Sequence, residues 1–483
     1  MGRRIIAWSV MLLCIPAVLH AQSVSGDPRV ISAVKLVEAW LDAQVAYNRI
    51  PGMSVAIVHD QELLWSRGFG YADLEKKIPA SPGTIYSICS ISKLFTSVAV
   101  MQLRDEGKLR LDDPIKKHLA WFNIKESFPG SPPVTIRGLL THSSGLPRES
   151  DFPYWTGPDY PFPTHEQIVE RITKQEMLYP ADTYYQYSNL GLTLAGEIVA
   201  AASGQTYADY VRRNILTPLG LKDTTPEIPA AQRGSRLAAG YSQPLRDGSR
   251  KRMPAFDVRG VAPAAGYAST VEDLGRFASW QFRLLGKGGK EVLAASTLKE
   301  MQRVQFVDTD FQTMRGLGFS ISRPTSKPIV GHGGSCPGYK SDLSMYTKDK
   351  IAAIVMTNAN EVNPAEYTRY ILEIIAPAAS KAQEGPGKAT QPDPALEKFI
   401  GRYDRPFGGE THILIMEGDL AALSLPTTNP TRWEKLKRVG ENTFKRVRED
   451  GELGETYTFE LGPDGKVTRL FHNSNYSIRV QNP

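Results

Sequence analysis

Cysteine is scarce in this chain, and its few positions do not suggest a disulfide framework or a metal centre. The 483 residues include three cysteines, Cys14, Cys89 and Cys336. None of them has the paired spacing typical of a zinc site. The metalloprotease segment His-Glu-x-x-His is also missing. The sequence therefore predicts no bound metal and no other cofactor.

Long apolar runs are missing as well, apart from one at the N-terminus. Arg3 and Arg4 precede an apolar run over residues 5–19, and Ala21 is followed by polar residues. This pattern predicts a cleaved signal peptide over residues 1–21, because the run is too short for a confident membrane span. Cys14 follows a leucine where lipoprotein cleavage needs a small residue, so lipid anchoring is less expected. We expect an exported protein, periplasmic or secreted, with no membrane span.

Charge clusters of one sign are not found either. Lys and Arg total 57 against 51 Asp and Glu, a net charge of +6 that becomes +4 (6 − 2) if Arg3 and Arg4 leave with the signal peptide. The basic residues are scattered, whereas a nucleic-acid-binding surface needs them gathered. We therefore expect no nucleic-acid partner. With 41% hydrophobic and 22% charged residues, the composition is that of a globular enzyme.

A change of composition predicts two domains. Residues 381–394 are rich in glycine, proline and polar side chains, which is typical of a linker. In the first domain, residues 22–380, apolar residues at helical spacing predict a helix over residues 91–103. Two short apolar runs in it predict buried strands, Ser54–Val58 and Ile351–Met356.

The second domain, residues 395–483, has a different pattern. Short segments alternate apolar and polar residues and are separated by turn residues, which predicts a small antiparallel barrel or sandwich. The expected strands are Thr411–Met416, Asn442–Val447, Thr456–Leu461 and Lys466–Phe471.

The tetrad Ser90-Ile91-Ser92-Lys93 is the first candidate for chemistry. It places a hydroxyl and an amine on one face of a helix. A desolvated lysine can activate a serine hydroxyl, and the start of a helix favours the developing negative charge. Ser296-Thr297-Leu298-Lys299 has the same spacing. Its charged neighbours predict an exposed helix, whereas the first tetrad lies in a strongly apolar one.

Two further segments offer polar groups for the same site. Tyr187-Ser188-Asn189 can point a phenol and an amide to one side of an extended segment. His332-Gly333-Gly334-Ser335 combines an imidazole with glycines that let the backbone approach a ligand closely. The amides of Ser90 and Ser335 could then form an oxyanion hole. Taken alone, each segment is more often structural.

In their order and separation, these three segments resemble the signatures of the serine β-lactamase and penicillin-binding protein superfamily, especially its class C-like branch. The resemblance covers about residues 35–378. It extends to the segments Thr135–Leu146, Asn214–Leu221 and Gly266–Thr270. It implies an α/β (α+β) fold with an antiparallel sheet flanked by helices and an all-helical subdomain, here followed by a lipocalin-like barrel.

The resemblance also implies roles for the site residues. Ser90 is expected to be the nucleophile, with Lys93 and Tyr187 as proton shuttles. Asn189 is expected to position the substrate and the lysine. The edge strand beside the substrate is expected to contain His332, Gly334 and Ser335.

One departure from the superfamily favours peptidase or esterase activity over β-lactamase activity. Where many relatives have Lys-Thr-Gly, this chain has His332-Gly333-Gly334. Histidine is mostly neutral at pH 7, so it lacks the fixed charge that holds a substrate carboxylate. We expect binding of carboxylate substrates to improve as the pH falls through the pKa of His332. Cys89 and Cys336 adjoin Ser90 and Ser335, so converging amides would bring them close; we expect two buried thiols, with a disulfide as the alternative.

The sequence leaves several functions open for a small-molecule or short-peptide substrate. D-amino-acid peptidase or carboxypeptidase and carboxylesterase are favoured equally, and class C-like β-lactamase less. A non-catalytic penicillin- or cell-wall-binding module is the alternative outside enzymes. An α/β-hydrolase is excluded because no Gly-x-Ser-x-Gly occurs.

Structural roles and assembly stay open too. The segment Pro147–Thr164 is either a lid or a surface loop, and the barrel is either a gate over the site or a remote module. The oligomeric state is not indicated.

Overall fold

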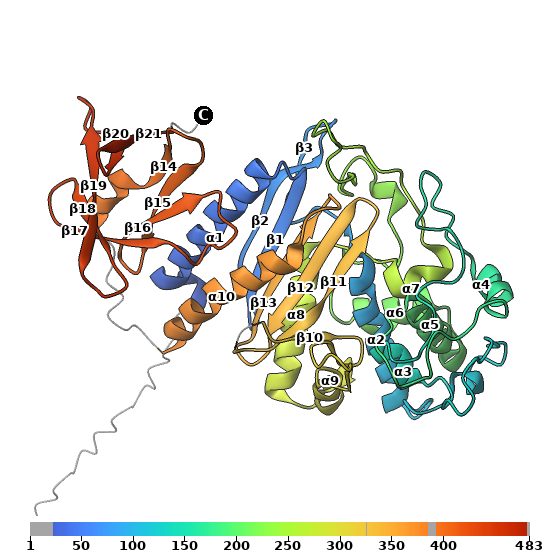
Figure 1. Ribbon diagram of the computed structural model, residues 1–483. Helices are drawn as coiled ribbons and strands as arrows, with labels where there is room; N and C mark the ends of the chain where they lie inside the picture. The colour runs from blue at the N-terminus through green and yellow to red at the C-terminus, as the bar shows by residue number, and fades with distance from the viewer. Residues whose placement is uncertain (1–22, 325, 385–392, 481–483) are drawn as a thin grey trace, which may run out of the picture.

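The computed structural model describes residues 23–324, 326–384 and 393–480. Within these residues a sheet-and-helix domain is followed by a separate barrel (Figure 1). The predicted signal peptide, residues 1–21, lies outside the described residues. So does most of the predicted linker, residues 381–394, although the long helix α10 (Pro364–Gln383) extends into its first positions.

The sheet of the first domain is antiparallel and, in the described residues, contains nine strands. Their order is β3-β2-β1-β13-β12-β11-β10-β9-β8. The strands are β1 (Gly52–His59), β2 (Glu62–Asp73), β3 (Ile78–Pro79), β8 (Phe306–Val307), β9 (Met314–Arg315), β10 (Ser320–Ser322), β11 (Ile329–Cys336), β12 (Tyr339–Tyr346) and β13 (Ile351–Thr357). Both predicted buried strands are confirmed, as β1 and β13.

Helices cover both faces of this sheet, which explains why β1 and β13 are buried along their whole length. Successive side chains of a strand point to opposite faces. Accordingly, Val55 and Ile57 of β1 join the core beneath α1 (Pro28–Tyr47) and α10. Ala56 and Val58 join the other core, beneath α8 (Val271–Lys287).

A helical subdomain lies beside the sheet (Figure 1). Its central helix, α2 (Ser92–Asp105), closely matches the helix predicted over residues 91–103, and most of its side chains are buried. The other helices of the first domain are α3 (Ile136–Thr141), α4 (His165–Ile172), α5 (Asn189–Ser203), α6 (Tyr207–Val211), α7 (Ala262–Ala265) and α9 (Ala295–Met301). Two short two-stranded sheets complete the first domain, β4 (Tyr86–Ser87) with β5 (Ala268–Ser269), and β6 (Lys290–Glu291) with β7 (Leu293–Ala294).

The second domain is a closed antiparallel barrel, with eight strands in the described residues. They are β14 (Gly401–Asp404), β15 (Glu410–Met416), β16 (Asp419–Leu425), β17 (Glu434–Arg438), β18 (Thr443–Val447), β19 (Leu453–Leu461), β20 (Val467–His472) and β21 (Asn475–Arg479). The four predicted strands correspond to β15, β18, β19 and β20. β14, β16, β17 and β21 were not predicted; in β17 only Leu436 of the five residues is buried. The predicted fold class is confirmed in both domains.

The barrel packs against α1 and α10, the two helices between it and the sheet in Figure 1. Leu414 and Leu423 of the barrel share one apolar core with both helices. Trp40 Nε1 and Gln44 Nε2 of α1 both donate to the carbonyl of Thr427, over 3.0 and 2.8 Å. The barrel therefore covers apolar surface of the first domain. No helix within the described ranges is long and apolar enough to cross a bilayer.

Candidate active site

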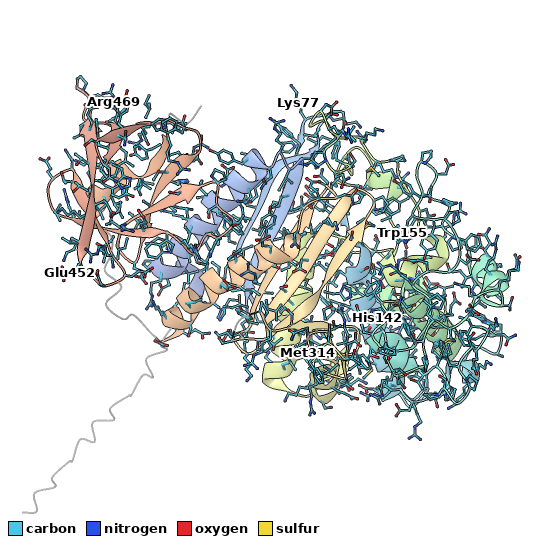
Figure 2. The ribbon with its side chains drawn as sticks, in the orientation of Figure 1. Lys77, His142, Trp155, Met314, Glu452 and Arg469 are labelled. Atoms are coloured by element: carbon cyan, nitrogen blue, oxygen red, sulfur yellow. A yellow bond between two sulfur atoms is a disulfide. The ribbon has the colours of Figure 1, made fainter. Side chains whose placement is uncertain are left out.

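A cavity of about 920 Å³ opens between β11 and the helical subdomain. Its lining includes every predicted site residue except Lys93, which lies beneath it: Ser90, Tyr187, Asn189, His332, Gly334 and Ser335. All the lining residues fall between positions 90 and 365, so no described residue of the barrel borders this cavity. In Figure 2, Trp155 on this side and Arg469 of the barrel lie far apart.

Ser90 lies in a tight turn, η2 (Cys89–Ile91), that leads directly into α2. Cys89, just before it, has a left-handed backbone with φ +51°. Ser92 stabilises this turn, since its hydroxyl donates to the carbonyl of Cys89 and accepts from the amide of Tyr267 over 3.0 Å. The nucleophile predicted from the sequence thus precedes a helix on an anchored, uncommon turn.

Lys93 is fully buried, with 0% of its surface exposed. Its Nζ lies 3.1 Å from Ser90 Oγ, 2.8 Å from Asn189 Oδ1 and 2.8 Å from the Ala264 carbonyl oxygen. Burial lowers the pKa of Lys93 well below its usual value. A neutral amine has two N–H groups for the two carbonyl-type oxygens, which leaves its lone pair for the Ser90 hydroxyl. The geometry is that of a base beside a nucleophile.

The aromatic ring of Tyr187 is surrounded by one imidazole and two basic side chains. His142 stacks on it with ring centroids 4.3 Å apart, and Lys93 Nζ and Arg148 Cζ each lie 4.8 Å from its ring centroid. Burial raises the pKa of the Tyr187 phenol, and its interaction with the Ser90 hydroxyl partly offsets that rise. The phenol is therefore neutral at pH 7 and can donate a proton.

His142 packs against the Tyr187 ring and binds the backbone of the next residue, Ser188. It adopts a left-handed backbone at the end of α3, and its Nδ1 accepts from the Ser188 amide over 3.1 Å. Burial lowers the pKa of His142 well below its usual value. Sequence reasoning gave it no role.

Asn189 is the first residue of α5, and Ser188 is the residue that caps this helix. The Ser188 hydroxyl accepts from the Gly191 amide over 2.8 Å. The Asn189 side chain reaches Lys93 with its oxygen and Glu149 with its nitrogen, over 2.8 Å in each case. Glu149 also borders the cavity. It was missed because it lies in an irregular segment without a motif.

β11 forms the opposite wall of the cavity. A Cβ on Gly334 would lie 2.2 Å from the Ile88 carbonyl oxygen, so only glycine allows this close approach. His332 Nδ1 lies 2.6 Å from the carbonyl oxygen of Gly333. Burial lowers the pKa of His332 to about 3. The expected titration of His332 near neutral pH is therefore wrong, because burial disfavours the charged form of the imidazole.

Cys89 and Cys336 form a disulfide, with Cα atoms 5.8 Å apart. The prediction of two free thiols is thus wrong. These residues are separated by 247 positions, and the sequence could bring them close only through the expected convergence of the Ser90 and Ser335 amides, without fixing their Cβ directions. The bridge ties the residue before Ser90 to the residue after Ser335, so it joins the two backbone segments of the expected oxyanion hole.

Two more features of the cavity were not assigned from the sequence. Trp155 and Tyr160 of the segment Pro147–Thr164 line it, so this segment forms a wall of the site and is not a remote surface loop. Arg315 of β9 lines it too, beside Met314, which is labelled in Figure 2. The Arg315 guanidinium donates to Tyr185 Oη and Ser320 Oγ.

Comparisons with known proteins agree with this geometry. The profile of the Beta-lactamase family matches residues 37–376. "Beta-lactamase-like protein 2" of Dictyostelium discoideum is 27% identical over 356 residues, 73% of this chain and 64% of that protein. "Penicillin-binding protein 4*" of Bacillus subtilis is 26% identical over 326 residues, 65% of this chain and 68% of that protein. This chain thus spans less than two thirds of the first relative's length.

A solved structure extends the likeness. The octameric penicillin-binding protein homologue from Pyrococcus abyssi superposes with a TM-score of 0.64 and 25% identity, and covers 92% of this chain and 100% of its own. The family profile spans well over half of the chain, and the buried Ser90–Lys93 pair lies at the centre of the cavity. The chain therefore belongs to the β-lactamase family and has the fold of its class C-like branch.

Proposed function

We propose that this serine hydrolase is a D-amino-acid carboxypeptidase, which removes the last residue from short peptides with a free terminal carboxylate. Arg315 is the observation that carries this proposal. Its guanidinium lines the same cavity as Ser90. No carboxylate of the described residues lies within ion-pair distance of it, and its Nε is buried without a hydrogen-bond partner among them.

Arg315 supplies what the neutral His332 lacks. A guanidinium is always charged and offers several N–H donors in one plane, which suits a carboxylate. Arg148, another cation of the lining, already pairs with Glu149 over 3.2 Å. A substrate carboxylate at Arg315 would place the preceding amide bond in the part of the cavity that contains Ser90.

The chemistry follows from the contacts of Lys93. As Ser90 Oγ attacks the carbonyl carbon, the neutral amine of Lys93 takes the hydroxyl proton. The amides of Ser90 and Ser335 stabilise the oxyanion of the tetrahedral intermediate. When the C–N bond breaks, Tyr187 passes a proton to the leaving amine and is reprotonated from Lys93. Water then hydrolyses the acyl ester on Ser90.

Substrate kinetics test the assignment. The substrates are a peptide ending in D-Ala-D-Ala, its C-terminal amide, p-nitrophenyl acetate and a cephalosporin. We expect Arg315→Gln to lower kcat/KM for the free-acid peptide by about 10- to 100-fold, since a charged hydrogen bond contributes about 1.5–3 kcal/mol. The ester should be hydrolysed as before. Lys340→Gln, which removes another lining cation, is the matched control and should have a smaller effect.

Three outcomes overturn the carboxypeptidase assignment. Hydrolysis of the ester alone would indicate a carboxylesterase, and a preference for the cephalosporin would indicate a β-lactamase. A stoichiometric burst without turnover on every substrate would indicate a penicillin- or cell-wall-binding module.

A further inference from the structure

The carboxylate of Glu149 gathers more donors than any other acid at the cavity. Asn189 Nδ2 lies 2.8 and 3.1 Å from its two oxygens, and Trp155 Nε1 lies 3.1 Å from Oε1. The Tyr154 hydroxyl donates to Oε2, and Arg148 Nε lies 3.2 Å from Oε1. Four neighbours, three of them from the same segment Pro147–Thr164, thus converge on one side chain.

These contacts leave Glu149 little capacity to bind a substrate. An ionised carboxylate offers about four lone-pair positions, and the four hydrogen bonds from Asn189, Trp155 and Tyr154 occupy them. This is the reverse of Arg315, whose Nε has no partner in the described part of the chain. Glu149 faces inward, toward Asn189, and its effect has to pass through that residue.

Glu149 decides which way the amide of Asn189 points. A carboxylate only accepts hydrogen bonds, so the NH2 group of Asn189 must face it. The amide oxygen then faces Lys93, 2.8 Å from Nζ. The reversed amide would set its oxygen against the carboxylate and its N–H groups against the amine, losing both bonds.

The orientation of Asn189 in turn aims Lys93. Asn189 Oδ1 and the Ala264 carbonyl oxygen accept the two N–H bonds of the neutral amine, both over 2.8 Å. The third neighbour of Lys93 Nζ is Ser90 Oγ, 3.1 Å away, so the lone pair of the amine points toward it. We propose that Glu149 is a positioning residue of the catalytic machinery, which fixes the amide of Asn189 and thereby directs the lone pair of Lys93 at Ser90. This inference rests on the role of Lys93 as base in the proposed function.

The charge of Glu149 has a second effect on the same amine. Burial lowers the pKa of Lys93, the negative charge of Glu149 raises it in part, and Arg148 lowers it again. The other titratable groups facing Lys93 are Tyr187, with its raised pKa, and His142 and His332, with lowered ones. All three are neutral at pH 7, so Glu149 and Arg148 are the charges that tune the amine.

Glu149→Gln tests the proposal, with p-nitrophenyl acetate as substrate because its hydrolysis needs the nucleophile and base but no carboxylate anchor. One oxygen of the amide cannot accept all the donors, so Asn189 should lose its fixed orientation. We expect kcat to fall by up to about 100-fold, the cost of misplacing reacting groups by about 1 Å, with KM little changed.

The pH profile separates positioning from a merely structural role. Activity rises with pH as Lys93 loses its proton. Without the negative charge of Glu149 the ammonium form is less favoured, so the acidic limb of kcat/KM should move to lower pH. Glu149→Asp keeps the charge but retracts the carboxylate. It should restore the limb toward its original position while kcat stays reduced.

Asp151→Asn is the matched control. It removes the same charge from the same segment, where Asp151 is half exposed and lies 3.8 Å from Arg171, and it should leave kcat and the acidic limb unchanged. Unchanged kcat and limb in Glu149→Gln would overturn the proposal. If that variant does not fold, Tyr154→Phe removes one donor and keeps the charge, and an unchanged kcat there overturns it as well.

Failure of this inference and failure of the proposed function look different. If Lys93→Ala hydrolyses the ester at the original rate, the assignment of the base is wrong. If Lys93→Ala is inactive while Glu149→Gln behaves like the original protein, only the role of Glu149 is wrong.

Discussion

The two Ser-x-x-Lys tetrads of this chain have the same spacing and opposite surroundings. Ser90 and Lys93 lie at the start of α2, where the amine is fully buried. Ser296 and Lys299 lie on α9, and both side chains are exposed to solvent. In the second tetrad it is Thr297 that is buried, donating to Asp105 over 2.7 Å.

The difference shows that the tertiary surroundings, and not the Ser-x-x-Lys sequence itself, activate the serine as a nucleophile. Water stabilises the ammonium form of an exposed lysine, which then has no lone pair to accept a proton. The contacts that exclude water from Lys93 come from Asn189 and Ala264, 96 and 171 positions away in the sequence. Each prediction below changes a residue of the first tetrad or of its surroundings.

Replacing the serine gives the largest expected contrast. Ser90→Ala should abolish covalent labelling by a fluorophosphonate or a labelled penicillin, because no other described serine has a buried amine in this geometry. The Ser296→Ala variant should be labelled to the same extent as the original protein. Gel fluorescence of the two variants measures the contrast, and labelling that survives Ser90→Ala contradicts the mechanism.

Replacing the lysine should give a large but incomplete loss. Lys93→Ala should slow acylation by about 100- to 10,000-fold, the usual size of general-base catalysis. Lys93→Arg should be nearly as slow, since a guanidinium stays protonated. Lys299→Ala should leave the rate unchanged. Stopped-flow acylation provides the measurement, and a fast arginine variant would make Lys93 a purely electrostatic residue.

The disulfide beside Ser90 is expected to affect stability. Replacing both Cys89 and Cys336 by alanine should lower the free energy of unfolding by about 2–5 kcal/mol, because the bridge closes a long loop. Urea unfolding followed by circular dichroism measures this. In the unreduced, denatured protein, mass spectrometry should find neither cysteine alkylated. Two alkylated thiols would contradict the bridge.

At neutral pH the smallest effect concerns His332, which burial keeps neutral. Its pKa is about 3 in the folded protein, against an ordinary value of 6.5. Between these values the unfolded chain binds a proton that the folded chain does not. Stability should therefore fall as the pH falls from 6.5 toward 3, by about 1.4 kcal/mol per pH unit for this group.

Removing the imidazole checks that slope. His332→Asn should make the free energy of unfolding less dependent on pH in this window, as measured by urea titrations at several pH values. Above pH 6.5 the dependence should be unchanged. An unaltered slope would mean that His332 titrates as an exposed histidine does.

Much of the site could be predicted from the sequence, because its parts occur as short motifs. Ser90, Tyr187, Asn189, His332 and Ser335 border one cavity, as expected from the three segments. Glu149, Arg315 and His142 were not found. Glu149 lies in an irregular segment, and Arg315 on a strand of two residues. Neither position has a periodicity or a fixed spacing to the motifs.

By itself, the sequence determined the local structures and their order. The spacing of apolar residues predicted α2, and unbroken apolar runs predicted the buried strands β1 and β13. Alternation of apolar and polar residues predicted half of the barrel strands. These features depend on neighbours within a few residues. The fold class and the roles of the site residues were indicated by the resemblance of three short motifs to the superfamily.

Only the tertiary structure decided the chemical state of those residues. A pKa depends on how much water and charge surround a group, and for Lys93 and His332 the surroundings come from distant parts of the chain. The same holds for the pairing of Cys89 with Cys336. Proximity across the fold is the physical cause in each case, and no short stretch of sequence contains it.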